Sequence, residues 1–157
     1  MGFSLILSRE TNINSITPVV MSMLDDLGED KLDPSGWLNS VNVLQDCWLK
    51  VETVDHHLVG YIHLKPFTQT VLEIHPYLLK SMRKYSYKTA DSFLNWFNVE
   101  CPKQYHSLYT KTPSYNRKVA LFLLKMGFFK SSELKAVFYK NNRLWDLHQY
   151  QLFKGVS

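Results

Sequence analysis

The chain has 157 residues, of which 45% are hydrophobic and 14% aromatic, which predicts a single domain over residues 1–157 and excludes a disordered chain. No apolar run reaches the roughly 20 residues of a membrane-spanning helix and no basic leader precedes the apolar run of residues 1–10, so we expect neither a membrane span nor a cleaved signal peptide. The net charge of +4 divides into −5 for residues 1–46 and +9 for residues 47–157. The basic part either faces an anion, such as a cofactor phosphate, nucleic acid or an acidic partner, or forms a solvated lysine-rich surface.

The first 46 residues predict a strand, a helix and a loop. The strand lies at residues 3–7. Thr17 and Pro18 predict the start of the helix, because proline suits the first helical turn, and Gly28 can end it. Residues 28–40 are acidic and rich in turn formers, so we expect a loop there. The apolar side chains that share one face of this helix are Val19, Val20, Met23, Leu24 and Leu27.

Three strands follow, at residues 47–54, 58–66 and 70–75, and they are rich in Val, Ile, Leu, Trp and Tyr. A turn at residues 55–57 joins the first two as a hairpin. Pro76 predicts the end of the third strand, because proline has no N–H to give to a sheet ladder. These runs therefore predict an antiparallel meander.

The remaining residues predict two helices that alternate with strands. A basic, aromatic stretch at residues 77–88 leads into a helix that ends before Pro102. Thr112 and Pro113 open a second helix, and Gly127 stands where a C-terminal cap belongs. The order β, α, loop, β-β-β, α, β, α, β-β indicates a mixed α+β domain. The strands of this part are residues 105–110, 128–139 and 144–153, the last two joined by a turn at Asn141 and Asn142. The packed helix faces contain Ala90, Phe93, Leu94 and Phe97, and Val119, Phe122, Leu123 and Met126.

Three motifs in this order resemble the Gcn5-related N-acetyltransferase (GNAT) superfamily over residues 3–153. The best match is the second helix, where Asn116 to Phe128 resembles the family pattern N-x-x-A…Y-x-K-x-G-F. The run from Leu72 to Pro76 is similar to the central strand of the family, which ends in V-x-P. The third motif is the closing hairpin with Trp145 and Asp146. The resemblance implies a mixed central sheet with helices on both of its faces. The positions that agree with the helix pattern are Asn116, Lys125, Gly127 and Phe128.

The sequence departs from this family where the pyrophosphate of coenzyme A would bind. The family has a glycine-rich loop there, which lets the backbone approach the phosphates at a helix N-terminus. No glycine lies between Gly60 and Gly127 in this chain. Basic side chains of residues 80–88 would have to bind phosphate by charge instead. By resemblance, the cofactor-binding residues are Arg83, Lys84, Tyr85, Ser86 and Lys88, with Asn116 on the pantetheine arm.

A second departure concerns proton transfer. Many members of the family have a tyrosine four residues before the glycine of the helix motif, and this tyrosine is the acid that protonates the departing thiolate. In this chain the corresponding residue is Leu123, which has no proton to give. By resemblance, Glu73 is the carboxylate that would deprotonate an amine through water, and strand amides near residues 74–77 would hold the thioester carbonyl. The alternative for Glu73 is a strand glutamate that faces solvent or pairs with a lysine.

Other residue patterns favour no further chemistry. We expect no metal site, because His56 and His57 point to opposite faces of a strand and His63 and His75 lie on separate strands. Cys47 and Cys101 lack metal-ligand spacing and are interpreted as reduced cysteines of a cytosolic protein. The aromatic and basic residues 83–88 could stack on single-stranded nucleic acid, but packing over a helix start is the simpler interpretation. Among the tryptophans, Trp37 in the predicted loop is the candidate for a partner contact.

A narrower resemblance concerns the run from Leu72 to Tyr77, Arg83, Tyr85 and the run from Leu124 to Gly127. These are similar to a small family of short-tailed bacteriophage proteins described as head-assembly proteins. The resemblance implies a phage protein located in the bacterial cytoplasm or in the virion. We therefore predict a non-catalytic protein without a cofactor that binds phage or host proteins, with its oligomeric state open. The alternative is an active acetyl-CoA-dependent N-acetyltransferase that acts on an amine or a protein.

Overall fold

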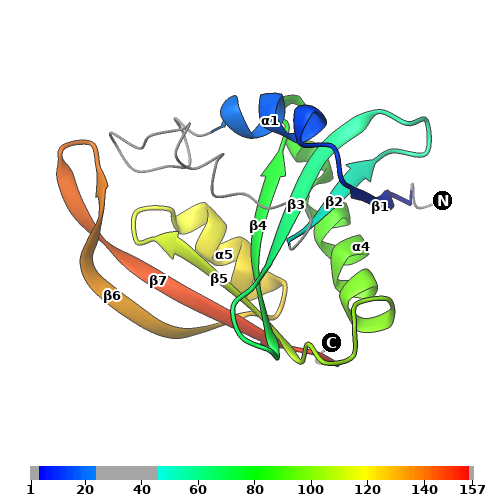
Figure 1. The fold of residues 1–157 in the computed structure, drawn as a ribbon. Coiled ribbons are helices and arrows are strands. Elements are labelled where there is room, and N and C mark those ends of the chain that lie inside the picture. Colours follow the sequence, from blue (N-terminus) through cyan, green and yellow to red (C-terminus); the bar gives the residue numbers. More distant parts are fainter. Residues whose placement is uncertain (1–3, 24–45, 156–157) are drawn as a thin grey trace.

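The structure is a computed structural model that describes residues 4–23 and 46–155 (Figure 1). The strands are β1 (Ile6–Glu10), β2 (Cys47–Glu52), β3 (Leu58–Pro66), β4 (Val71–Leu78), β5 (Ser107–Pro113), β6 (Phe129–Lys140) and β7 (Arg143–Phe153). The helices are α1 (Ile13–Met21), the 3-10 helix η1 (Lys80–Tyr85), α4 (Ser86–Val99) and α5 (Arg117–Lys125). The strands form one seven-stranded sheet in the order β1-β2-β3-β4-β5-β7-β6. Neighbours are antiparallel, except for the parallel pair β4 and β5. The predicted loop at residues 28–40, with Trp37, lies outside the described residues.

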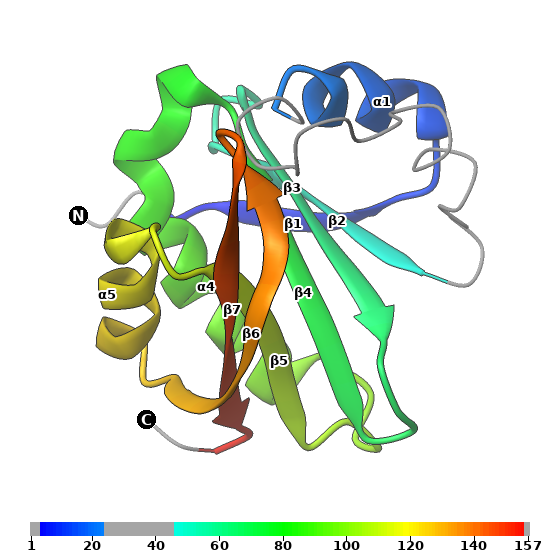
Figure 2. The same cartoon turned by 90° about the vertical axis from the view of Figure 1, so that its left-hand side faces the viewer.

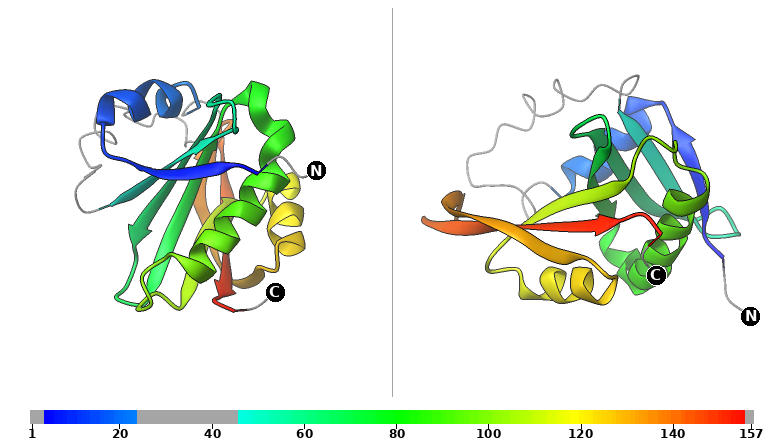
Figure 3. Two further views of the ribbon diagram at one scale, coloured as in Figure 1. Left: turned by 90° about the vertical axis from the view of Figure 1, so that its right-hand side faces the viewer. Right: turned by 90° about the horizontal axis from the view of Figure 1, so that it is seen from below.

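Helices cover both faces of the sheet, as predicted. α1 lies on one face, and α4 and α5 lie on the other (Figure 2 and Figure 3). Under α1, the rings of Trp48, Tyr61 and Tyr77 pack against Ile16 and Val20 of the helix. A larger apolar cluster fills the space between the opposite face and the helices α4 and α5. The two cores confirm the predicted α+β class with a mixed central sheet.

Two predicted boundaries near the N-terminus are wrong. β1 covers Ile6–Glu10 rather than residues 3–7. α1 begins at Ile13, because the Asn12 side chain accepts a hydrogen bond from the Asn14 amide and so caps the helix. Pro18 therefore lies inside α1 instead of in its first turn, and the helix loses one backbone hydrogen bond there.

The apolar face of α4 agrees with its prediction, since Phe93 and Phe97 are buried in the larger core. The face predicted for α5 is correct at Leu123, which is 7% exposed, and wrong at Val119, which is 37% exposed. Gly127 ends α5 with a φ of +95°, the left-handed conformation expected of a C-terminal glycine.

The start of α5 is later than predicted. β5 continues to Pro113, so Thr112 and Pro113 are strand residues and do not open the helix. The side chain of Asn116 accepts a hydrogen bond from the Val119 amide at 3.4 Å and forms the N-cap of α5 instead. An asparagine cap satisfies an amide of the first turn, which proline cannot do.

The strand predicted to end at Pro76 runs on to Leu78. Pro76 pairs in register with Ile62 of β3, and β4 continues through it. A proline is tolerated in a sheet only where its nitrogen points away from the hydrogen-bonded neighbour. Its nitrogen must therefore point to the other side of β4, toward β5.

The β6–β7 hairpin extends beyond the body of the domain (Figure 3). Its predicted turn is confirmed, since Asn141 and Asn142 have φ values of +53° and +59°, which a two-residue hairpin turn of type I′ requires. The register of the hairpin shifts twice, between Lys130 and Ser132 and between Leu134 and Phe138. Near its tip, Tyr115 contacts the Phe138 ring at a tilt and the Trp145 ring edge-on, and the Arg143 guanidinium lies over the Trp145 ring.

Candidate functional site

A gap between β4 and β5 is the central feature of the candidate site. The two strands pair in parallel only from Val71 with Ser107 to Glu73 with Tyr109, although β4 continues to Leu78 and β5 to Pro113. Figure 1 shows the two strands starting side by side and then diverging. A hydrogen bond from the Thr110 hydroxyl to the Ile74 carbonyl, 3.2 Å long, spans the point at which the pairing ends.

The edge of β4 that faces this gap has few hydrogen-bond donors. The Ile74 carbonyl points to β5, and the N–H and C=O of one strand residue point to the same side. The alternate residues Ile74, Pro76 and Leu78 therefore face the gap, whereas His75 and Tyr77 face β3. Pro76 has no N–H, and the parallel pairing of Glu73 with Tyr109 uses the Ile74 N–H to bond Tyr109 C=O. None of the amides at residues 74–77 that were expected to hold a thioester carbonyl is therefore left for that role on this edge. The next gap-facing donor is the amide of Leu78.

Three ionisable side chains lie beside the gap on the α1 face of the sheet. The His75 Nε2 and the Lys111 Nζ are 2.8 Å and 3.5 Å from the same Glu73 oxygen, Oε1. The hydrogen bond with His75 and the charge of Lys111 lower the pKa of Glu73 to about 2, against the opposing effect of burial. The pairing with a lysine that was considered as the alternative for Glu73 is therefore present, and a histidine accompanies it.

A second polar pair lies behind this group. His63 is paired in register with His75, and their ring centroids are 5.9 Å apart. His63 Nε2 is 2.8 Å from Asp46 Oδ2, and its ring stacks on that of Trp48 at 4.2 Å. Burial lowers the pKa of His63, so this imidazole is neutral and donates its Nε2 proton to Asp46.

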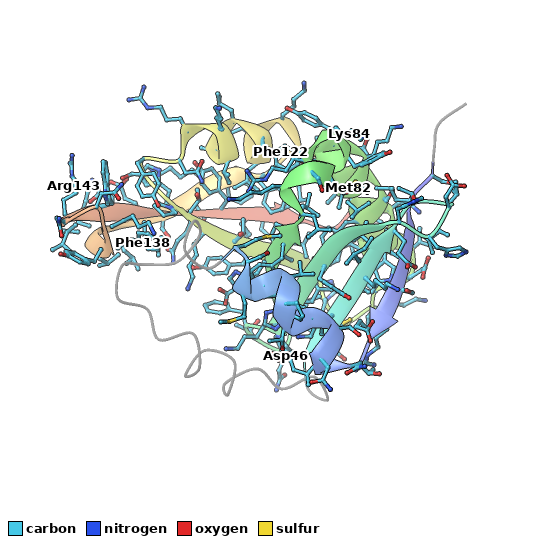
Figure 4. The ribbon with its side chains drawn as sticks, turned by 90° about the horizontal axis from the view of Figure 1, so that it is seen from above. Asp46, Met82, Lys84, Phe122, Phe138 and Arg143 are labelled. Atoms are coloured by element: carbon cyan, nitrogen blue, oxygen red, sulfur yellow. The ribbon has the colours of Figure 1, made fainter. Side chains whose placement is uncertain are left out.

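The opposite opening of the gap, on the α4 and α5 side, is built differently. The turn that follows β4 is the helix η1, whose amides bond to their own turn: Met82 N–H donates to Leu79 C=O, and Ser86 N–H donates to Arg83 C=O. The centroids of the Tyr87 and Phe122 rings are 5.1 Å apart, and this contact bridges α4 and α5. Figure 4 shows Met82, Lys84 and Phe122 at this junction.

The residues predicted to bind a cofactor lie around this junction. Arg83 and Lys84 are exposed on η1, and the Lys84 ammonium lies 5.3 Å from the centre of the Tyr85 ring. Tyr85 is partly buried against the larger core. Ser86 and Lys88 lie in the first turn of α4, and the Ser86 hydroxyl donates to Arg83 C=O. Asn116 is the N-cap of α5, at the other end of that helix from Lys125, whose ammonium lies 4.7 Å from the centre of the Tyr87 ring.

One group on the β6–β7 hairpin has the residue types of a metal site. The ligand atoms of Glu133, Asp146 and His148 lie within 4.8 Å of one another. Sequence reasoning missed this trio, because only the shifted register of the hairpin brings the three together. Lys130 and Lys135 already neutralise the carboxylates, with their ammonium groups 2.8 Å and 2.7 Å from Glu133. No helix in residues 4–23 or 46–155 has the length and apolar character to cross a membrane.

Comparisons with known proteins show the fold. No protein-family model and no curated protein sequence matches the chain. Among solved structures, the chain is similar to spermidine N-acetyltransferase from Vibrio cholerae in complex with CoA and spermine, with a TM-score of 0.76 and 13% identity over 96% of each chain. A chimera of that enzyme, SpeG, with hSSAT has a TM-score of 0.75 and 15% identity over 96% of this chain and 95% of that chain. The form of SpeG in complex with manganese ions has a TM-score of 0.71 and 14% identity over 96% of this chain and 92% of that chain. The chain therefore has the GNAT fold, that of the acyl-CoA N-acyltransferases.

Proposed function

We propose that this chain is an acetyl-CoA-dependent N-acetyltransferase that acts on an amine or on a protein amino group. The observation that carries the proposal is the end of β4–β5 pairing next to Glu73 and His75. A thioester arm would enter where the backbone pairing of the two strands ends, and the ionisable side chains flank that point on the α1 face. The names of the solved neighbours, which are N-acetyltransferases, support the same activity.

Acetyl-CoA fits the residues present through charge and not through a backbone cradle. The Met82 and Ser86 amides donate within the η1 turn, and no glycine lies between Gly60 and Gly127. Arg83 and Lys84 are exposed at the junction of η1 and α4 and would hold the pyrophosphate there. The bound thioester would supply the acetyl group and a thiol leaving group. Because exposed charges are screened by salt, we expect the affinity to fall as ionic strength rises.

Calorimetric titration with acetyl-CoA at low and high salt, followed by a thiol-release assay, tests this function. Thiol release reports transfer to any acceptor, so spermidine, a lysine-containing peptide and water can each be offered. We expect heat of binding that weakens with salt and thiol release that depends on an acceptor. Absence of binding and of thiol release at every acceptor would contradict the proposal.

A second candidate is the non-catalytic bacteriophage protein, which would act by protein contacts in head assembly or in the virion. The buried Leu123 at the position of the family tyrosine favours it, as does the contact of the Tyr87 and Phe122 rings between α4 and α5. The projecting hairpin also exposes apolar side chains that a partner could cover: Phe129, Leu134, Val137, Leu144 and Phe153. A titration without acetyl-CoA binding, combined with binding of purified head proteins that Leu134→Lys abolishes, would favour this candidate.

A further inference from the structure

His75 occupies the most favourable position in the candidate site for accepting a proton. It follows Glu73 by two residues on β4, so both side chains point to the α1 face. Glu73 is the last residue that pairs β4 with β5, so His75 lies just beyond the paired region, and its side chain is 30% exposed compared with 12% for Glu73. His75 therefore stands where the gap opens, and Glu73 lies behind it.

The hydrogen bond between the two side chains fixes the tautomer of the imidazole. His75 Nε2 is 2.8 Å from Glu73 Oε1, and an ionised carboxylate can only accept a hydrogen bond. In the neutral ring the proton is therefore on Nε2, and the lone pair is on Nδ1. Nδ1 of His75 has no hydrogen-bond partner within residues 4–23 and 46–155.

Glu73 itself is a poor proton acceptor. The hydrogen bond with His75 and the nearby Lys111 hold the pKa of Glu73 at about 2, so it stays ionised and has little tendency to take a proton from an amine. A carboxylate of this kind orients an imidazole and stabilises its protonated form.

The other charged and titratable groups around His75 agree with this division of roles. From β3, the neutral His63 faces His75, with Asp46 bonded to its far side. Lys65 of β3 acts on His63 through its charge. From β5, Lys111 reaches Glu73 rather than His75. On β4, burial raises the pKa of Tyr77 and keeps it neutral. Among the described residues, Glu73 is therefore the only carboxylate paired with His75.

We propose that His75 is a catalytic residue whose Nδ1 accepts the proton of the acceptor amine, with Glu73 as the positioning residue. This inference rests on the proposed acetyltransferase function. The amine nitrogen forms a bond to the thioester carbonyl carbon and gives one proton to Nδ1. The carbon–sulfur bond then breaks, and its electron pair stays on sulfur. The proton passes from His75 to the thiolate directly or through water, so that an amide and a free thiol result and His75 is neutral again.

Three single variants test the assignment in the thiol-release assay. His75→Gln keeps an N–H donor for Glu73 and removes the basic nitrogen, so we expect kcat to fall by about 10²- to 10⁴-fold with little change in the KM for acetyl-CoA. His57→Gln, at an exposed histidine of the β2–β3 turn, is the matched control and should behave as wild type. Glu73→Gln keeps the basic nitrogen of His75, so we expect a smaller fall in kcat than for His75→Gln, again with little change in the KM for acetyl-CoA.

Nitrogen NMR of the histidine rings adds a readout that does not depend on turnover. We expect the His75 proton on Nε2 in the wild type and a mixture of tautomers in Glu73→Gln. A wild-type proton on Nδ1 would overturn the assignment. If the wild type is active and the kcat of His75→Gln is within about threefold of the wild-type kcat, the assignment of His75 is also overturned. This holds whether or not Glu73→Gln abolishes turnover. A wild type that neither binds acetyl-CoA nor releases thiol would overturn the proposed function, and this assignment with it.

Discussion

The two openings of the β4–β5 gap differ in chemistry. On the α1 face, Glu73, His75 and Lys111 form a connected polar group. On the α4 and α5 side, the Met82 and Ser86 amides donate within the η1 turn, and the Tyr87 and Phe122 rings meet between the two helices. Under the proposed function, proton transfer and phosphate binding would therefore depend on separate sides of one sheet. A chain of this fold can alter the side that binds phosphate without altering the side that would move protons.

The largest expected effect comes from Gly60→Ala on β3, which would push against β4, the strand that both openings share. A Cβ at Gly60 would stand 2.2 Å from the Tyr77 carbonyl oxygen and 2.8 Å from the Leu78 Cα. Both contacts are with backbone, which cannot rotate away. We expect a loss of unfolding free energy of about 3 kcal/mol or more, measured by urea unfolding. Gly155→Ala, where a new Cβ meets nothing within 4 Å, tests the opposite case and should cost far less, through its positive φ alone.

The next effect tests whether the α4 and α5 side is closed. Leu123 is 7% exposed in the larger core, so Leu123→Tyr should cost about 1–3 kcal/mol by overpacking, with a further penalty if the hydroxyl is left without a partner. Leu121→Tyr, at a position 67% exposed on the same helix, is the matched control. If Leu123→Tyr has an unchanged unfolding midpoint and releases thiol faster than wild type, the α4 and α5 side is open.

The pH dependence of stability distinguishes the two polar pairs on the α1 face. Burial lowers the pKa of His63, so the stability it contributes is present above pH 6.5 and declines as pH falls below that value. The pKa of Glu73 is about 2 against 4.5 for a free carboxyl, so its contribution, on the order of 1–2 kcal/mol, is present above pH 4.5 and is lost as pH falls through about 2. The urea concentration at the unfolding midpoint should decrease in both pH windows, and Glu73→Gln should remove the decrease in the lower pH window. Constant midpoints from pH 7 to pH 3 would contradict this.

The smallest effect on stability, and a selective effect on binding, is expected at the basic residues of η1. Reversing the charges of the exposed Arg83 and Lys84 to Glu should change the unfolding free energy by less than about 0.5 kcal/mol. The same change should weaken acetyl-CoA binding at low salt and have less effect at high salt. Lys103→Glu, at an exposed lysine beyond the other end of α4, should leave binding unchanged. Equal affinities for the double variant and wild type would show that η1 is only a solvated surface.

Sequence reasoning was most successful where local chemistry decides the structure. The turn at Asn141 and Asn142, the cap at Gly127 and the buried face with Phe93 and Phe97 all follow from side-chain type and spacing. It failed at Pro76, because whether a proline ends a strand depends on which side its nitrogen faces. That side is fixed by the neighbours of β4 in the sheet, which the sequence alone does not give.

The candidate site was predictable only in part. Glu73 was identified through its resemblance to a family motif, and the structure adds His75 and Lys111 as its partners. The two-residue spacing of Glu73 and His75 on a predicted strand was a signal that could have linked them, since alternate strand residues share a face. The approach of Lys111 could not be predicted, because it depends on the parallel register of β4 and β5.

The outer edge of the sheet has a consequence for the behaviour of the protein at high concentration. β6 is the last strand, and one whole side of its backbone has no neighbouring strand among the described residues. Such an edge can pair with another molecule and start aggregation. The two register shifts interrupt that edge, and Asp146 holds the second by accepting a hydrogen bond from the Ala136 amide at 3.0 Å. The charged side chains of Lys130, Glu133 and Lys135 also line this strand, and charged residues on an edge strand disfavour its pairing with a second molecule.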